Sequence, residues 1–171
     1  MPKISTPHDL LVEELKDLYN AENQLLKALP KMAKAAENED LKEAFTTHLK
    51  QTEGQVKRLD KIFKQLGEKP TGKKCHAMEG LIEEGKEILE EDYTPVIRDL
   101  ALIVAAQKVE HYEIAGYGSA RTLAELVEED DIAELLQETL DEEGETDKLL
   151  TGIAESINLE AAAVGEDEEE E

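Results

Sequence analysis

Four segments of the chain have the apolar spacing of amphipathic helices, and each carries a glutamate within its apolar stripe. This spacing predicts amphipathic helices that pack through one face. A carboxylate in a core is costly unless it is paired, hydrogen-bonded or bound to a metal ion. The acids in the stripes are Glu22, Glu53, the pair Glu110 and Glu113, and Glu143. Together they predict a shared cation site, of the two-metal carboxylate type, inside a helical bundle.

The composition favours a single all-α domain. Of the 171 residues, 40% are hydrophobic and 36% charged, with two Phe and no Trp, so an aliphatic helical core is expected. The formal net charge of −23 repels nucleic-acid phosphates and anionic lipid, which argues against nucleic acid and membranes as partners. The single cysteine excludes an internal disulfide, and no apolar run has the length of a membrane span. A cytoplasmic location is therefore expected.

Capping signals predict the first helical hairpin. Thr6 and Asp9 fit a capping box with Pro7 in the first turn, and Pro30 predicts a kink or a break further along. Asn38 lies in a short polar turn and can cap the second helix. Gly67 is expected to end that helix.

The second half of the chain repeats this arrangement. Residues 67–94 form a long connection with a short amphipathic helix, and helices are expected over about 96–127 and after Asp130. Two hairpins joined by a long crossover predict a ferritin-like four-helix bundle. The bundle is expected over residues 1–160, followed by an acidic, disordered tail over residues 161–171.

The hairpins place the acids at matching depths. Reflecting Glu22 through the turn near Asn38 reaches residue 54, next to Glu53. Reflecting Glu143 through the turn near residue 129 reaches residue 115, close to Glu113. Glutamate oxygens suit iron or manganese, and carboxylates of ferritin-like bundles hold two such ions.

Several further residues leave alternatives open. The Glu-x-x-His pattern of such bundles is absent after Glu53 and Glu143, so the site could be rich in carboxylate or partly degenerate. His48 and His111 could be ligands or hydrogen-bonding residues of the core or rim. Glu142, Asp147 and His111 are reserve ligands or supports of the direct ligands. Tyr19 and Tyr117 could hydrogen-bond to the carboxylates, although core packing explains both. Gly54 and Gly144 could mark a close approach of helices or neutral drift.

The chain resembles the YciE/YciF family of ferritin-like proteins over about residues 6–157. The similarity lies in EELKDLYNAENQLLKALPKMAKAA (13–36), KKCHAMEGLIEEG (73–85), AAQKVEHYEIAGYG (105–118) and TLDEEGETDKLL (139–150). The resemblance implies a four-helix bundle, often dimeric, with a metal site between its helices and a link to bacterial stress responses. It implies that Glu22, Glu110, Glu113 and either Glu142 or Glu143 occupy the family's acidic positions. Some relatives carry a histidine near position 53, where this chain has Glu53.

The resulting hypothesis is a stress-protective di-metal protein. Its partners would be iron or manganese ions, dioxygen or peroxide, and a second copy in a homodimer. If the protein is an enzyme, it would be a di-metal oxidoreductase that reduces dioxygen or peroxide. The alternative is a metal-free helical scaffold or stress-induced interaction protein with glutamates at a wet bundle rim.

Overall fold

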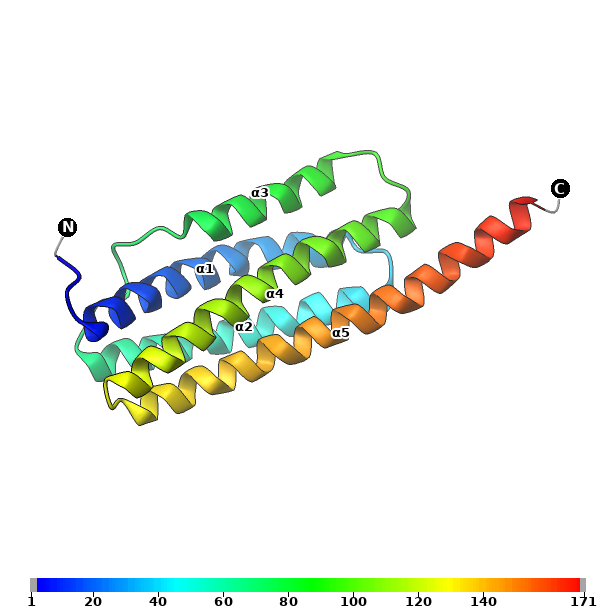
Figure 1. The fold of residues 1–171 in the computed structure, drawn as a ribbon. Coiled ribbons are helices and arrows are strands. Elements are labelled where there is room, and N and C mark those ends of the chain that lie inside the picture. The colour runs from blue at the N-terminus through cyan, green and yellow to red at the C-terminus, as the bar shows by residue number, and fades with distance from the viewer. Residues whose placement is uncertain (1–2, 170–171) are drawn as a thin grey trace.

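The computed structural model describes the backbone of residues 3–169 and side chains as far as Ile157. Its elements are α1 (Pro7–Ala35), α2 (Glu39–Leu66), α3 (His76–Glu90), α4 (Pro95–Leu126) and α5 (Asp130–Glu169). Within the described part of the chain, no residue is in a strand. The hairpins α1–α2 and α4–α5 form a four-helix bundle, and α3 lies outside it along α1 and α4 (Figure 1). The predicted all-α bundle with a crossover helix is confirmed.

The predicted helix ends are observed where local chemistry specifies them. Thr6 and Asp9 form the capping box of α1, and the Asn38 side chain accepts a hydrogen bond at the start of α2. Gly67 ends α2 with a φ of 68°, a left-handed conformation that glycine adopts without steric cost. The break predicted as one alternative at Pro30 is wrong, because α1 continues through this residue. Pro30 is exposed and lies near the end of the helix, so its ring meets solvent and neighbouring buried residues keep the last turns packed.

A buried polar layer divides the hydrophobic core into two clusters. The first cluster includes Leu25, Phe45, Leu102 and Leu150, and the second includes Leu15, Leu59, Tyr117 and Leu136. The buried polar residues include Glu22, His48, Thr52, Gln55, Glu110, Glu113, Thr139, Glu143 and Thr146. Because all four bundle helices contribute to this layer, its members face one another across the bundle axis.

The C-terminal part of α5 continues beyond the other bundle helices (Figure 1). It includes residues 161–169, which belong to the predicted disordered tail, whereas Glu170 and Glu171 lie outside the described residues. Disorder of the tail and the boundary near residue 160 stay predictions. Among the described residues, none of the helices combines the length and apolar character needed to cross a membrane.

Candidate metal centre

Four buried side chains in the polar layer present potential ligand atoms within 4.8 Å of one another. They are His48 from α2, Glu110 and Glu113 from α4, and Glu143 from α5. Glu22 of α1 is fully buried as well, and its charge acts on Glu110 and Glu113. Every helix of the four-helix bundle therefore contributes at least one side chain to this group, which we call the central cluster: Glu22, His48, Glu110, Glu113 and Glu143.

Helical periodicity directs these side chains inward. Glu110 and Glu113 are one turn apart on α4, and Tyr117 continues the same buried face. On α5, Glu143 lies between the buried residues Thr139 and Thr146. The packing that buries apolar neighbours on these faces also holds the acids in the core.

His48 is oriented towards the carboxylates. Its Nε2 atom lies 3.2 Å from Oε1 of Glu110 and 3.7 Å from Oε2 of Glu143. Its Nδ1 atom lies 3.4 Å from Oε1 of Gln51. In the tautomer with its proton on Nδ1, the ring donates to Gln51 and directs its Nε2 lone pair at the centre. This is the arrangement of a metal-binding imidazole whose second nitrogen is held by a neighbour.

Several atoms of the central cluster have no hydrogen-bond partner among the described residues. They are Oε2 of Glu22, Nε2 of His48, Oε2 of Glu110, both carboxylate oxygens of Glu113, and Oε2 of Glu143. Buried polar atoms are normally satisfied, so such a concentration of unpartnered atoms requires a ligand, protons or water. Oxygen donors with one imidazole suit iron or manganese. The residues present therefore fit a metal centre.

The acids of the central cluster titrate far from their ordinary range. Burial, with the charge of Glu143 acting in the same direction, raises the pKa of Glu22 to about 8. Burial likewise raises the pKa of Glu110 to about 7, with the charges of Glu22 and Asp147 acting in the same direction. Burial and neighbouring carboxylates hold the pKa of Glu113 and of Glu143 well above the usual value. Without a cation the cluster retains protons near neutral pH, so a metal ion must displace them.

Polar neighbours position two of the acids. The Tyr117 hydroxyl donates a hydrogen bond to Oε1 of Glu22, and the Gln55 amide donates to Oε1 of Glu143. The same amide donates to Oε2 of Glu142 at 3.0 Å. Arg58 also pairs with Glu142, its Nη2 lying 3.0 Å from Oε1. Arg58 therefore balances the charge of Glu142 at the edge of the polar layer.

Comparison with known proteins identifies the family. The family model described as a domain of unknown function (DUF892) matches residues 6–163. Protein YciF of Escherichia coli (strain K12) is 48% identical over 160 residues, which cover 92% of this chain and 96% of YciF. The chain belongs to the YciF family. The resemblance recognised in the sequence is thus confirmed.

Solved structures extend this relationship to the fold. The crystal structure of the E. coli stress protein YciF matches with a TM-score of 0.88, covering 90% of this chain and 98% of that one. YcfI from Rhodopseudomonas palustris is 45% identical with a TM-score of 0.85, covering 88% of this chain and 96% of its own. A two-domain protein from Anabaena variabilis with a ferritin-like domain is 17% identical, with a TM-score of 0.59 over 89% of this chain and 37% of that protein. The fold is ferritin-like.

The structure brings together four of the five acids expected to be direct ligands: Glu22, Glu110, Glu113 and Glu143. Glu53 is exposed, so its expected place in the buried stripe of α2 is wrong. The buried face of α2 passes instead through His48, Thr52 and Gln55. Glu53 follows Thr52 directly and is rotated by about 100° on the helix, away from the bundle axis.

The three reserve ligands lie outside the central cluster. Glu142 pairs with Arg58, as described above. His111 and Asp147 pair with each other, 3.2 Å apart, with the His111 side chain 68% exposed. The sequence does not decide whether His48 is a ligand. Hydrophobic periodicity shows which face of a helix is apolar, but it does not show whether a histidine lies on that face. His48 lies four residues before the buried Thr52 and seven before the buried Gln55, and residues at this spacing share one face of a helix. This spacing is the signal that could have predicted its burial.

Proposed function

We propose that this protein is a ferritin-like di-metal carboxylate protein that binds two iron or manganese ions. The ligands would be Glu22, His48, Glu110, Glu113 and Glu143. The observation that carries the proposal is the central cluster itself, in which ligand atoms of four residues lie within 4.8 Å and all are buried. Four carboxylates balance the charge of two divalent cations. A protein that used these acids only for solubility would expose them to water.

Bound iron or manganese would supply the redox chemistry, which we propose is reduction of dioxygen or peroxide. The residues of the chain would hold and orient the metal ligands. Tyr117 holds one oxygen of Glu22 and Gln55 holds one oxygen of Glu143, while other carboxylate oxygens stay unpartnered within the described structure. The hydrophobic clusters on either side of the polar layer exclude bulk water from the centre.

We further propose a role in protection against oxidative or general stress. Its support is the E. coli relative that is described as a stress protein and is 48% identical to this chain. The imidazole of His48 bears on which metal is bound. Calcium and magnesium prefer oxygen ligands, so His48 favours a transition metal over either of them.

The test is metal content after anaerobic loading with ferrous iron or with manganese, followed by desalting and elemental analysis. The wild-type chain is expected to retain about two ions, as ferritin-like carboxylate sites do. The variant Glu110→Gln with Glu113→Gln should retain none, because it removes two charges and two anionic ligands. These amides preserve the side-chain volume, and circular dichroism verifies that the variant is folded.

The matched control is Glu43→Gln with Glu53→Gln, which removes the same charge from two exposed positions of α2 outside the central cluster. It should load like the wild type. Less than one metal ion per wild-type chain, or equal loading of both double variants, would contradict the proposal. The metal-free scaffold would then be the better explanation.

A further inference from the structure

A groove opens between the crossover helix α3 and the bundle helices α1 and α4, with a cavity of about 260 Å³. Its walls are mainly aliphatic. Leu81, Ile82 and Leu89 come from α3, and Leu25, Met32 and Val109 come from the bundle. Met78 is the one buried residue of α3, which lies along α1 and α4 outside the four-helix bundle (Figure 1).

The charged residues that line the groove are all lysines: Lys27, Lys31 and Lys86. This is unusual for a chain with 42 acidic residues against 19 Lys and Arg. Lys86 pairs with Glu83 at 2.7 Å, whereas Lys27 and Lys31 form no ion pair within the described residues. The latter two are one turn apart on α1, so their ammonium groups can converge on one anion at the rim. The groove is therefore locally cationic on an acidic molecule.

The inner wall of the groove borders the central cluster. Leu25, Met32 and Val109 also line a second, smaller cavity of about 10 Å³. His48 and Glu110 also line that smaller cavity. The groove and the cavity beside the proposed metal ligands therefore share three aliphatic side chains.

We propose that this groove binds a linear anionic amphiphile, a free fatty acid of medium chain length. Its hydrocarbon chain would lie along the aliphatic walls, where removal of its apolar surface from water favours binding. Its carboxylate would pair with Lys27 and Lys31 at the rim. A neutral oil would leave the lysines unused, and a large anion without a chain would leave the walls exposed. This binding does not depend on bound metal.

The first test is isothermal titration of the metal-free, full-length protein with decanoate below its micellar concentration. Gly85 lines the groove, and a Cβ atom added there meets no heavy atom within 4 Å. Gly85→Leu should therefore fill the groove without disturbing the helix and weaken decanoate binding by about tenfold or more. Gly80→Leu is the matched control, because Gly80 lies in the same helix, is equally open and does not line the groove. Its binding should equal that of the wild type.

The second test addresses the charge. Lys27→Glu with Lys31→Glu should weaken binding of decanoate but leave binding of decan-1-ol unchanged, since the alcohol lacks the anionic group. The control Lys57→Glu with Lys61→Glu makes the same change in charge on exposed positions of α2. No binding of decanoate by the wild type, or equal binding by Gly85→Leu, would overturn the proposal. If Gly85→Leu instead converts a dimer to a monomer in light scattering, the groove is an interface between copies and the proposal also fails.

Discussion

Tyr117 connects two helices at the level of the central cluster, because its hydroxyl on α4 donates a hydrogen bond to Glu22 on α1. Tyr117→Phe removes this donor and leaves both oxygens of Glu22 buried without a partner. We expect metal affinity to fall about tenfold, since the ligand is no longer held in place. The free energy of unfolding of the metal-free protein should fall by about 1–2 kcal/mol. Metal titration and urea denaturation measure the two effects.

Tyr19→Phe serves as the control for this change. Tyr19 packs edge-on against Phe63, with ring centroids 5.9 Å apart, beside the same hydrophobic cluster as Tyr117. Among the described residues, its hydroxyl makes no hydrogen bond to the central cluster, unlike that of Tyr117. Its metal affinity should equal that of the wild type. Equal metal affinity for Tyr117→Phe would show that Glu22 does not need this hydrogen bond to bind.

At the level of residues, the buried acids of α1, α4 and α5 could be predicted from the sequence. The buried polar residues of α2 could not, as Glu53 and His48 show. Glu22, Glu110, Glu113 and Glu143 could be predicted because each interrupts a run of apolar residues at helical spacing. Reflection through the turn predicted residue 54, whereas the α2 residue of the central cluster is His48, six positions earlier. Gln55, next to the reflected position, contacts Glu143. Reflection could not give the face of the helix. The buried polar residues of α2 do not contribute to its apolar periodicity. The prediction therefore placed Glu53 in the core, whereas the buried residue is its neighbour Thr52.

At the level of elements, Asp99 attaches the α1–α2 turn to α4. This buried carboxylate accepts hydrogen bonds from the backbone N–H groups of Glu37 and Asn38, at 2.9 and 2.8 Å. Asp99→Ala should lower the free energy of unfolding by about 1–3 kcal/mol, because two backbone donors lose a charged acceptor. Urea denaturation measures the loss. Asp92→Ala, at an exposed position, should leave the stability unchanged, and an equal loss in both variants would contradict this role.

The glycines within the helices test packing between elements. A Cβ atom at Gly54 meets no heavy atom within 4 Å, so close approach of helices does not explain this glycine. Gly54→Ala should therefore raise the free energy of unfolding by about 0.5–1 kcal/mol, which is the cost of glycine in a helix. At Gly116 the same atom would lie 2.8 Å from Cδ2 of Leu18, which is 1% exposed. Gly116→Ala should therefore not raise the free energy of unfolding as Gly54→Ala does. Thermal unfolding of the two variants measures the difference. An equal increase in both would mean that the Leu18 side chain can move to make room.

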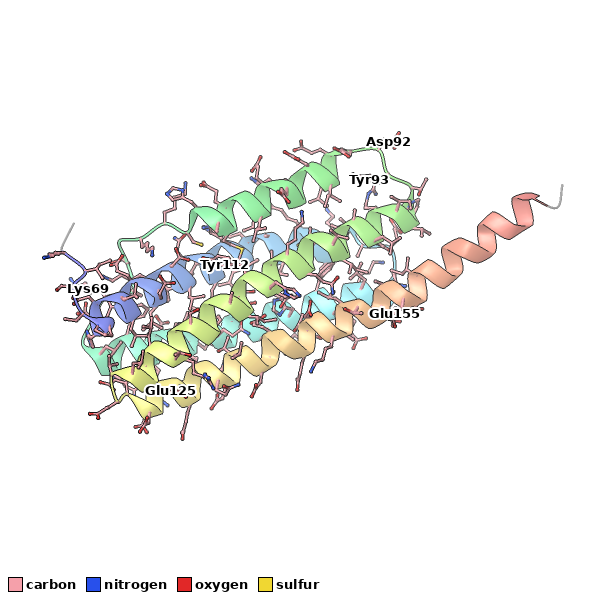
Figure 2. All side chains as sticks on the ribbon, in the orientation of Figure 1. Lys69, Asp92, Tyr93, Tyr112, Glu125 and Glu155 are labelled. Atoms are coloured by element: carbon pink, nitrogen blue, oxygen red, sulfur yellow. The ribbon has the colours of Figure 1, made fainter. Side chains whose placement is uncertain are left out.

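The ends of the helices could be predicted from the sequence more readily than the contacts between different helices. Thr6, Asn38 and Gly67 act through hydrogen bonds or backbone conformations within a few residues, and these depend on local sequence. The hydrogen bonds of Asp99 join residues separated by 61 and 62 positions, so no local sequence pattern predicts them. The same is true of Tyr112 on α4, which is labelled in Figure 2. Its hydroxyl makes a polar contact with Cys75 and so attaches the start of α3 to α4.

At the level of the whole molecule, the buried acids make stability depend on pH. The pKa of Glu22 rises from its ordinary 4.5 to about 8, and that of Glu110 from 4.5 to about 7. Between these values the folded state binds more protons than the unfolded state, so the free energy of unfolding falls as pH rises. The metal-free protein should therefore be most stable towards pH 4.5 with respect to these groups, and lose stability as pH approaches 8.

Thermal unfolding of the metal-free protein across this range measures the effect, in high salt to screen repulsion between surface charges. Glu22→Gln with Glu110→Gln should flatten the dependence of Tm on pH, while Glu53→Gln, at an exposed position, should retain it. Saturating manganese should reverse the trend, because the metal replaces the protons and binds only the folded state. A Tm that is constant or rises with pH in the metal-free protein would mean that the acids of the central cluster are not protonated in the folded state. The cluster would then need a permanent cation even in the protein as purified.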